Sequence, residues 1–393
     1  MATVHGAPRI IGVVTTARAD WSHLLPVVRR LEADPAVELR LYVTGMHLAP
    51  EFGLTVRDIE AAGCAIAERI EMLVASDTPH AIATSMGLGT MGFAHAFARS
   101  RPDVLVLLGD RFETHAAAIA ALPFTIPLAH LCGGESTEGL IDEALRHSLT
   151  KMSHLHFAAT EAYARRIVQM GEEPWRVTVS GAPSLDNLAR LTRLSRPELE
   201  ARVGVDLGGP TVLVTFHPVT LEYEDTEPHV TELLAALEKV GLPVIFTYPN
   251  ADTWGRIVIR MIDEYVASHA NATAVANLGP QAYFSLLEHC AMMVGNSSSG
   301  IIEAASFRLP VVNIGNRQRG RVHGANVIAV DCDRDAIVRG IRRAEDPGFR
   351  AALAALVNPY GDGHATERIV DVLKRTPLDR RLILKRFHQV AGG

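Results

Sequence analysis

The chain has 393 residues, of which 48% are hydrophobic, 21% are charged and 6% are aromatic. This length favours two domains, and the apolar fraction is sufficient for two cores and excludes a disordered chain. The formal net charge of −6 argues against a broad cationic surface for nucleic acid, so an anionic ligand would need a local basic pocket.

The four cysteines lie far apart, with no CxxC pair and no spacing typical of metal ligands. The first residues, MATVHGAPRIIGVV, lack the basic region, apolar run and cleavage site of a signal peptide. No segment approaches the roughly 18 consecutive apolar residues of a membrane span. We therefore expect a cytoplasmic protein without a metal site or membrane contact.

Short β-branched and apolar runs alternate with helical patterns along the chain, which predicts parallel sheets with crossover helices. In the first half, strands are predicted at residues 10–15, 38–44, 67–73, 103–108, 127–131, 154–158 and 177–180. The run DVLVLLG is apolar throughout, which indicates burial on both faces of its sheet.

The series of strands restarts in the second half, at residues 211–215, 243–247, 273–276, 292–294, 310–314 and 327–330. This restart predicts two doubly wound, Rossmann-like α/β domains that face each other across a cleft. We expect the first domain to span residues 1–190 and the second 191–364, followed by a tail, 365–393. The tail contains TERIVDVLKR and LILKRF, which are typical of amphipathic helix, and we expect it to pack back on the first domain.

Ligands of open α/β sheets bind beyond the carboxyl ends of the strands, so polar residues at those points are candidate site residues. Arg18, Asp20 and Ser22 follow the first strand, where a helix start beside an arginine suits an anion. Asp20 or Ser22 could equally cap that helix. The segment contains no GxGxxG, so a dinucleotide site is not indicated.

Asp110 and Arg111 follow the apolar strand DVLVLLG. They are either site residues, or a helix-capping aspartate that is paired with a structural arginine. The next strand ends in HLCGGESTEG, and a helix that contains Asp142 begins soon afterwards. Several carboxylates around one pocket can raise a pKa and create an acid/base pair, while the two glycines permit close backbone approach. Glu143 is interpreted as a solvated charge at the helix start.

His217 follows the first strand of the second half. It could be a catalytic residue, a phosphate contact or a structural histidine. Asn250 ends the next strand and could bind a ligand hydroxyl or form a turn.

The sequence GNSSSGIIE predicts a strand, a Ser/Gly loop and a helix whose backbone N–H groups and serine hydroxyls could bind a diphosphate. It lacks the Gly-Lys-Ser/Thr ending of a Walker A loop. Ser297 and Ser298 lie in this loop, and Glu303 could accept hydrogen bonds from both hydroxyls of a ribose. Arg317, in NIGNRQRGR, supplies positive charge for the phosphates, or belongs to a solvated basic loop.

Seven motifs resemble, in order, those of the UDP-N-acetylglucosamine 2-epimerase family, and especially the hydrolysing branch of sialic-acid pathways. They are TTARADWSHLLP, GDRFETHAAAIAA, GGESTEGLIDEALRHSLTKMSHLHF, FHPVT, YPNAD, GNSSSGIIEAA and NIGNRQRGR. The resemblance covers roughly residues 8–375. It implies a glycosyltransferase-B-like fold, a UDP-N-acetylhexosamine substrate held mainly by the second domain, no cofactor or metal, and a homodimer.

The resemblance also implies residue roles. It assigns to the nucleotide sugar and UDP the residues Arg18, Ser22, Asn250, Ser297, Ser298, Glu303 and Arg317, and to the chemistry Asp110, Asp142 and His217, with Arg111 beside them. Many relatives carry Glu at the third position of a His-x-Glu stretch where this chain has Cys132. Glu135 is a hypothesis for the missing catalytic carboxylate.

The implied reaction removes the C2 proton and expels UDP, giving a 2-acetamidoglucal-like intermediate. Water then yields N-acetylmannosamine and UDP, or UDP returns to give UDP-N-acetylmannosamine, and the motifs favour the hydrolysing outcome. Three alternatives remain: a UDP-sugar glycosyltransferase of the same fold, a 2-epimerase of a UDP-diacetamido-trideoxy sugar, and a nucleotide-sugar sensor without turnover.

Overall fold

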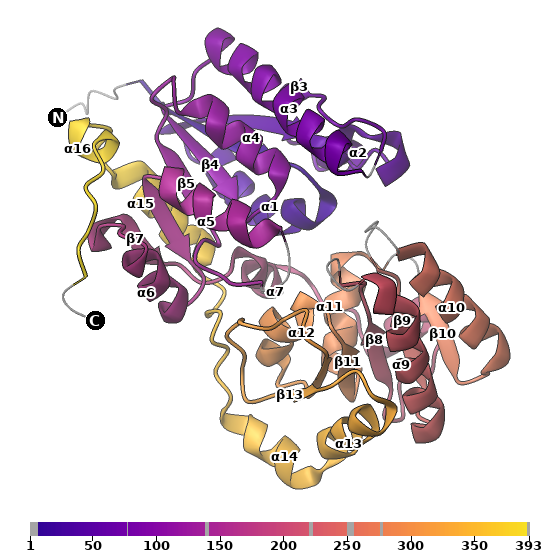
Figure 1. Ribbon diagram of the computed structural model, residues 1–393. Coiled ribbons are helices and arrows are strands. Elements are labelled where there is room, and N and C mark those ends of the chain that lie inside the picture. The colour runs from indigo at the N-terminus through magenta and orange to yellow at the C-terminus, as the bar shows by residue number, and fades with distance from the viewer. Residues whose placement is uncertain are drawn as a thin grey trace. The chain divides into compact units, whose positions relative to one another are not determined.

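The computed structural model describes residues 7–76, 78–137, 141–219, 223–249, 255–275 and 278–390. The chain divides into two compact units (Figure 1). Unit 1 consists of Met1–Glu135, Ile141–Ala189 and Tyr360–Gly393, and unit 2 of Ser136–Leu140 and Arg190–Pro359. The end of the chain thus returns to unit 1.

Unit 1 is built on a parallel sheet with the strand order β3-β2-β1-β4-β5-β6-β7. Its strands are β1 (Arg9–Thr15), β2 (Val37–Thr44), β3 (Ile66–Ile70), β4 (Val104–Leu108), β5 (Leu128–Leu131), β6 (Leu155–Ala158) and β7 (Val177–Val179). Every residue of β4 is buried, as expected for a central strand covered on both faces. The order turns at the β1–β4 junction, the position where open sheets of this class bind ligands.

Helices cover both faces of this sheet. They are α1 (Arg18–Glu32), α2 (Val56–Ala61), α3 (Pro79–Arg99), α4 (Phe112–Ala121), α5 (Asp142–Met152), α6 (Glu161–Gln169), α7 (Asp186–Arg190), α15 (Ala365–Arg375) and α16 (Arg380–Ile383). One core contains buried side chains of α1 and α15, and a second contains side chains of α3, α4 and α5. The sheet therefore lies between two helical layers.

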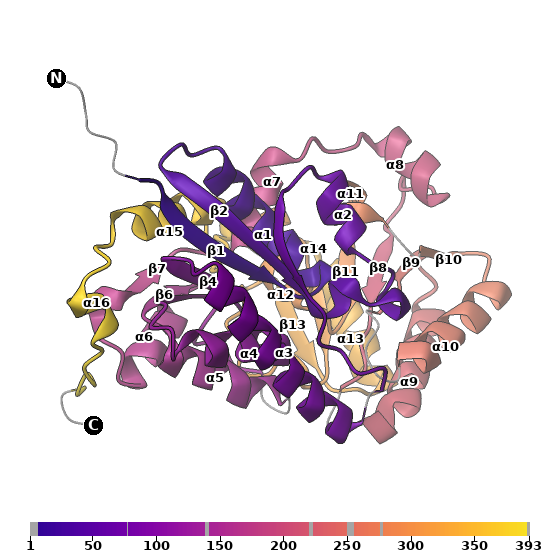
Figure 2. The same cartoon turned by 90° about the horizontal axis from the view of Figure 1, so that it is seen from above.

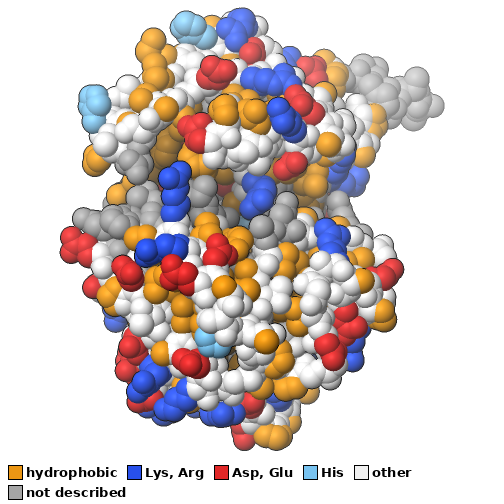
Figure 3. Space-filling view, turned by 90° about the vertical axis from the view of Figure 1, so that its right-hand side faces the viewer, with side chains coloured by type: hydrophobic (Ala, Val, Ile, Leu, Met, Phe, Trp, Pro, Cys, Tyr) orange, Lys and Arg blue, Asp and Glu red, His pale blue; other side chains and the backbone are white. Residues whose placement is uncertain are grey.

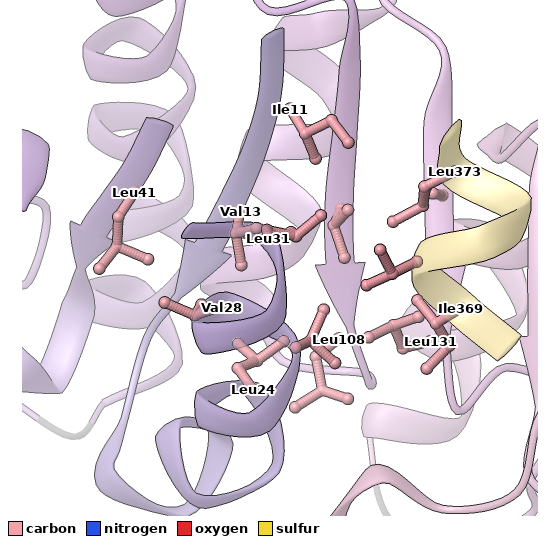
Figure 4. Packing of buried hydrophobic residues seen from close by; sticks show 14 of the residues in the cluster. Ile11, Val13, Leu24, Val28, Leu31, Leu41, Leu108, Leu131, Ile369 and Leu373 are labelled. Carbon is pink, nitrogen blue, oxygen red and sulfur yellow. The ribbon is translucent and has the colours of Figure 1, made fainter. Parts of the chain in front are cut away.

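The first core shows why the end of the chain belongs to unit 1. Leu24, Val28 and Leu31 line the inner face of α1 at helical spacing and are fully buried. Ile369 and Leu373 of α15 are also fully buried, one helical turn apart, in the same cluster (Figure 4). Burial of such side chains contributes roughly 1.5–3 kcal/mol each, so α15 is an integral part of this core.

Beyond α15, the segment LILKRF does not form the predicted helix, because α16 ends at Ile383 and extended chain follows. The guanidinium of buried Arg176 donates hydrogen bonds to three backbone carbonyl oxygens of this segment, in place of the hydrogen bonds that a helix would make. The acceptors are Arg381, Leu382 and Leu384, at 2.9, 2.9 and 3.2 Å. The tail is therefore held by its backbone and needs no helix.

Glu172 anchors the same segment from inside unit 1. Its fully buried carboxylate lies 2.6 Å from Nζ of Lys151, 2.8 Å from Nζ of Lys385 and 3.1 Å from Nε2 of His156. Burial alone would raise the pKa of Glu172, but these hydrogen bonds outweigh it and lower the pKa to about 2 from 4.5. The carboxylate is therefore ionised in the folded protein at neutral pH.

We expect Glu172→Gln to destabilise the protein at pH 7 and to have little effect at pH 2. The pKa is about 2 in the folded state against 4.5 in the unfolded chain, so the stabilisation is complete above pH 4.5 and is lost as the pH falls towards 2. Thermal unfolding of both proteins between pH 7 and pH 3 measures this. A difference in melting temperature that does not shrink on acidification would contradict it.

Unit 2 is built on a six-stranded parallel sheet with the order β10-β9-β8-β11-β12-β13. Its strands are β8 (Val212–Thr215), β9 (Val244–Thr247), β10 (Ala272–Val275), β11 (Met292–Gly295), β12 (Val311–Ile314) and β13 (Val327–Val330). Its helices are α8 (Arg196–Val203), α9 (Thr226–Val240), α10 (Gly255–Ser268), α11 (Gly279–His289), α12 (Ser298–Ile302), α13 (Arg334–Glu345) and α14 (Pro347–Ala352). Its ligand-binding position is correspondingly the carboxyl ends of β8 and β11.

The predicted fold class is confirmed: each predicted strand coincides with an observed one to within a few residues, and both sheets are parallel and doubly wound.

On the face drawn in Figure 3, acidic and basic side chains are interspersed. Among the described residues, no helix combines the length and the apolar character needed to cross a membrane.

Candidate functional site

Arg111 is held at the carboxyl end of β4 by a buried carboxylate. Its Nη2 and Nε donate to the two oxygens of Glu113, at 3.0 and 3.2 Å, and Glu113 is fully buried. Burial would lower the pKa of Arg111, but the negative charges of Glu113, Asp20 and Asp142 outweigh it and raise the pKa. Arg111 is therefore a permanent, rigidly oriented cation that several carboxylates surround.

Asp20 faces Arg111 from the first turn of α1. It accepts a hydrogen bond from the hydroxyl of Thr16, while burial raises its pKa despite the charge of Arg111. Ala17 is the N-cap of α1 and makes no side-chain cap bond, whereas the Asp20 carboxylate accepts hydrogen bonds from the backbone of Thr16 and Ala17. Ser22 donates to the carbonyl of Ala19 at 2.7 Å.

Arg18, the first residue of α1, is exposed at the carboxyl end of β1. Its position leaves the guanidinium available for an anionic ligand at the amino end of a helix, where the dipole also favours negative charge.

Asp110, next to Arg111, pairs with Arg146 of α5. Arg146 is only 1% exposed and also contacts Glu143, with Nη1 2.9 Å from Oε2. Glu143 in turn lies 3.1 Å from Nε2 of His147. The Glu143 side chain is 28% exposed, and its carboxylate shares Arg146 with Asp110 in one ion-pair network.

Glu135 and Asp142 complete the acidic group of unit 1. Glu135 is buried, and its carbonyl oxygen accepts from Nη1 of Arg146 at 3.4 Å. Asp142 begins α5 and is close enough to Arg111 to raise the pKa of that guanidinium. Arg146 thus contacts the carboxylate of Asp110 and the backbone of Glu135, and Arg111 lies within electrostatic reach of Asp142.

The two glycines before Glu135 are required by packing within unit 1. A Cβ at Gly134, where φ is +75°, would lie 2.5 Å from the carbonyl oxygen of Tyr163. A Cβ at Gly133 would lie 2.8 Å from Nδ1 of His130. The close approach predicted for these glycines is therefore made by the protein's own atoms.

Cys132, just before them, is partly buried and has a φ of +61°, so this turn is strained at the position of the family glutamate.

In unit 2, Asn296 holds the backbone of His217. Its side-chain oxygen accepts from the His217 N–H at 2.7 Å, and its amide nitrogen donates to the His217 carbonyl at 2.8 Å. The Asn296 carbonyl accepts from Arg317 at 3.1 Å and from Gln318 at 2.8 Å. One buried asparagine thus connects the segments that follow β8, β11 and β12.

Burial and the nearby charge of Arg317 lower the pKa of His217 to about 3. The imidazole is therefore neutral at pH 7 and can donate a single N–H hydrogen bond. A neutral donor can stabilise a phosphate oxygen without binding it as tightly as an imidazolium would.

The serine loop after β11 forms the predicted strand-to-helix turn. Ser297 is the N-cap of α12, and its hydroxyl accepts from the Ser299 N–H at 3.3 Å. Ser298 opens the helix and is partly exposed. Glu303 is buried directly after α12 ends, rather than within the helix. Asn250 lies outside the described residues.

A cavity of about 880 Å³ opens at the carboxyl end of the second sheet, within the size range of ligand sites. Its lining includes Phe216, Asn296 and Gln318. Its charged side chains are those of Arg319, Arg321, Arg339, Arg343 and Asp331. The excess of arginine suits an anionic ligand in an otherwise acidic protein.

Some residues that build these clusters carry no sequence signal of their own. Arg146 and Glu113 appear at ordinary helical positions, and only their burial shows that they orient Asp110 and Arg111. Asn296 was indicated only as part of the serine loop. Within the part of the chain that the structure describes, no group of three or more His, Cys, Asp or Glu side chains could hold a metal ion.

The sequence profile of the UDP-N-acetylglucosamine 2-epimerase family matches residues 29–374. This chain belongs to that family. A Legionella pneumophila relative named UDP-N,N'-diacetylbacillosamine 2-epimerase (hydrolyzing) is 38% identical over 96% of this chain and 98% of its own. A Campylobacter jejuni relative, GDP/UDP-N,N'-diacetylbacillosamine 2-epimerase (hydrolyzing), is 37% identical over 87% of this chain and 89% of its own. The suspected family and its hydrolysing branch are thereby confirmed.

Solved structures support the fold. The UDP-GlcNAc 2-epimerase of Neisseria meningitidis, bound to UDP-GlcNAc, has a TM-score of 0.82 at 18% identity, covering 94% of this chain and 100% of that chain. The Methanocaldococcus jannaschii UDP-GlcNAc 2-epimerase, in complex with UDP-GlcNAc and UDP, has a TM-score of 0.77 at 18% identity, covering 93% and 100%. The epimerase family therefore shares the two-unit, glycosyltransferase-B-like architecture of this chain.

Proposed function

We propose that the protein is a hydrolysing 2-epimerase of UDP-activated 2-acetamido sugars, with UDP-N-acetylglucosamine as substrate and N-acetylmannosamine and UDP as products. The observation that carries this proposal is the family match over residues 29–374, in a chain whose strand ends carry carboxylates in unit 1 and, in unit 2, a serine loop beside Arg317. Carboxylates can move the proton at C2, and arginines can hold the diphosphate.

A second substrate is favoured by a specific observation: two relatives, at 38% and 37% identity, are named as hydrolysing epimerases of diacetylbacillosamine nucleotides. A UDP-diacetamido-trideoxy sugar shares the reacting C1, C2 and acetamido group with UDP-N-acetylglucosamine. Measuring kcat/KM for each nucleotide sugar decides between them. The ratio of the two values shows which substituents at C4 and C6 of the sugar the enzyme prefers.

The first step of the proposed reaction is elimination. A carboxylate of unit 1, from the group of Asp110, Glu135 and Asp142, takes the proton from C2. The electron pair of that C–H bond forms the C1=C2 double bond, and the C1–O bond to UDP breaks. We assign the role of base to Asp110, whose carboxylate the buried Arg146 holds in one orientation.

The leaving group is UDP, whose diphosphate gains negative charge as the C1–O bond breaks. We assign its binding to Arg18, Arg111 and Ser22 of unit 1 and to Ser297, Ser298 and Arg317 of unit 2. Glu303 and Asn250 are assigned to the nucleoside. Neutral His217 donates a hydrogen bond to the departing oxygen.

The second step is hydration of the glycal. Water adds its hydroxyl to C1, while a protonated carboxyl delivers hydrogen to C2 from the face opposite to the one that lost it. The remaining proton of the water reprotonates that carboxylate, and the base of the first step releases the C2 proton to solvent. The net change is one water consumed, one UDP released and C2 inverted. Glu135 is the proposed donor, since Cys132 occupies the position of the family glutamate and the Glu135 side chain is buried nearby.

Incubation with UDP-N-acetylglucosamine in deuterated water tests the reaction. We expect free mannose-configured sugar with one deuterium at C2 in the NMR spectrum. Labelled sugar still attached to UDP would instead mean the non-hydrolysing outcome. Product without C2 deuterium, or turnover only when an acceptor is added, would indicate a glycosyltransferase, and binding without turnover would indicate a sensor.

We expect Ser298→Ala to weaken UDP binding by about tenfold to a hundredfold, since a hydrogen bond to a charged group contributes roughly 1.5–3 kcal/mol. Isothermal titration calorimetry with UDP measures the loss. Ser268→Ala is the matched control, because the Ser268 hydroxyl bonds only its own neighbourhood at the end of α10. Equal UDP affinity in Ser298→Ala and wild type would remove the serine loop from the nucleotide site.

The proposal includes a homodimer acting in the cytoplasm. None of the four cysteines, all of which lie in the described residues, is in a disulfide, which suits a reducing compartment. Analytical ultracentrifugation of the purified protein tests the dimeric state.

A further inference from the structure

The last residues that the structure describes, 374–390, differ in charge from the rest of the chain. They include six lysines and arginines and one aspartate, which gives a net charge of +5. Because the whole chain carries −6, the other residues together carry −11. A cationic segment on an acidic protein is typical of contact with an anionic partner. We call residues 374–390 the basic segment.

The cations of the basic segment fall into two groups. Lys374, Arg375 and Lys385 form ion pairs within unit 1. The other three are exposed and have no ion pair with any carboxylate of the described residues; they are Arg380, Arg381 and Arg386. Asp379, the one acid of the segment, is the N-cap of α16 and accepts hydrogen bonds from two backbone N–H groups of that helix. Three guanidinium groups therefore face solvent with their charge uncompensated.

The basic segment also exposes large apolar side chains. Leu384, Phe387 and Val390 follow one another at every third residue and are 54%, 69% and 54% exposed. Leu378, just before α16, is 39% exposed. Single apolar side chains are common on protein surfaces, but a series of them in one segment indicates a surface that something else covers.

Packing against unit 1 fixes Phe387 in its exposed position. The N–H of His388 donates to the carbonyl oxygen of Gly171 at 2.8 Å, which ties the segment to the domain. A Cβ at Gly171 would lie 2.5 Å from a carbon of the Phe387 ring, so this approach requires glycine. The ammonium group of Lys151 lies 5.0 Å from the centroid of the same ring. The ring is therefore held in place while most of its surface stays open to solvent.

Trp175 extends this surface to a neighbouring part of unit 1. Its indole ring is 40% exposed, and the guanidinium groups of Arg176 and Arg381 lie over it, 4.3 and 4.6 Å from the ring centroid. Tryptophan is enriched where membranes meet water, because it combines an apolar body with a polar N–H group. Figures 1 and 2 both draw α16 and the chain that follows it at the edge of unit 1, where another surface can approach.

We propose that the basic segment and Trp175 dock the protein on the surface of an anionic lipid bilayer. The three arginines without carboxylate partners bind lipid phosphates, and Leu384 and Phe387 enter the boundary between headgroups and acyl chains. A bilayer is favoured over an acidic protein, because it accepts cationic and apolar side chains together without a fixed complementary shape.

This contact is peripheral and differs from a membrane span. The expectation of no membrane contact was based on the lack of a long apolar run, which a surface contact does not need. The inner leaflet, which faces the cytoplasm, is the negatively charged surface that a cytoplasmic protein meets. The docking is also separable from the proposed reaction, because the basic segment contains none of the residues assigned to the nucleotide sugar.

Co-sedimentation of the full chain with lipid vesicles tests the proposal. We expect binding to vesicles of phosphatidylglycerol and phosphatidylcholine in equal parts, and binding about a hundredfold weaker to phosphatidylcholine alone. Raising the salt from about 0.1 M to about 1 M should weaken binding to the anionic vesicles about tenfold, because it shortens the screening length. No binding, or equal binding to both kinds of vesicle, would overturn the proposal.

Reversing two charges of the segment tests its electrostatic part. We expect the double variant Arg380→Glu, Arg386→Glu to bind anionic vesicles about a hundredfold more weakly, since each cation near such a surface contributes to affinity. The matched control is Arg334→Glu, Arg342→Glu, which changes the net charge equally at two exposed arginines of α13 and should bind as wild type does. Equal losses in both variants would show that net charge alone is responsible and would overturn the assigned surface.

The double variant Leu384→Ser, Phe387→Ser tests the apolar part. We expect binding to anionic vesicles to weaken about tenfold or more, because less apolar area enters the bilayer. Val357→Ser is the control: Val357 is 82% exposed, but no lysine or arginine lies within six positions of it in the sequence, so binding should not change. Vesicle binding that survives the loss of Leu384 and Phe387 unchanged would overturn the proposed insertion.

Two measurements without lipid keep these results separate from folding and from the reaction. The melting temperature of each variant should stay close to that of wild type, because the substituted side chains are exposed. Deuterium incorporation at C2 of the product should also be unchanged in the absence of vesicles. A variant that melts early is set aside, and the comparison of lipid compositions and salt with wild-type protein then decides the proposal.

Discussion

Replacing Asp110 by Asn should reduce kcat by about 10²–10⁴-fold, the range that a positioned acid or base contributes, with UDP affinity nearly unchanged. The amide preserves the shape of the side chain and removes its ability to accept the C2 proton. Quenched-flow or steady-state assays with calorimetry of UDP binding separate the two effects. Retention of most of the rate would exclude Asp110 as the base.

Glu143→Gln is the control for this experiment. Glu143 is the other carboxylate paired with Arg146, so its substitution perturbs the same ion-pair network without removing the proposed base. We expect Glu143→Gln to keep kcat within a few fold of wild type. If both variants lose activity equally, Arg146 and its partners act by maintaining structure, and the carboxylate chemistry must be assigned to Glu135 or Asp142.

Of the substitutions proposed here, Gly295→Ala should cause the largest loss of folding stability. At this residue, the last of β11, φ is +137°, and a Cβ would lie 2.0 Å from the carbonyl oxygen of Thr215 in the neighbouring strand. Backbone strain and the clash together should cost about 3 kcal/mol or more. Because Asn296 and the serine loop follow directly, UDP binding should be lost as well. Thermal unfolding and UDP calorimetry measure the two effects.

Gly241→Ala separates strain from clash. Gly241 caps α9 with a φ of +74°, and nothing lies within 4 Å of a Cβ added there. Only the conformational penalty of roughly 1–2 kcal/mol then applies. Equal destabilisation by the two substitutions would show that the close approach to Thr215 is relieved at little cost.

The sequence predicted the fold well because its central strands are short runs of apolar residues bounded by turn residues. The run that forms β4 is buried at every position, and its apolar character was visible directly. The restart of such runs near residue 211 likewise predicted the second sheet. Burial of whole strands leaves a local signal, and parallel order follows from the helical segments between them.

The candidate site was predicted only where residues follow strands. Asp110, Arg111 and His217 were selected as candidates in this way, whereas Arg146 was not singled out, because a helical arginine is solvated more often than buried. The role of Asn296 depends on contacts between segments that follow β8, β11 and β12. Such contacts join residues about 80 and 20 positions apart, so no local pattern encodes them. The amphipathic pattern after Ile383 failed because Arg176 binds those carbonyl groups instead.

The return of residues 360–393 to unit 1 has a consequence for biosynthesis. Five buried side chains from the end of the chain complete a core whose other buried members, the last of them Phe157, were translated more than 200 residues earlier; the five are Ala365, Ile369, Val370, Leu373 and Leu382. Domains generally fold as they emerge from the ribosome, the N-terminal one first. Here the earlier half must wait, with part of its apolar interior uncovered, until translation is almost finished, while the later half has every one of its strands beforehand. A nascent chain stalled before residue 360 would therefore be a substrate for chaperones or proteases through its first half, not its second.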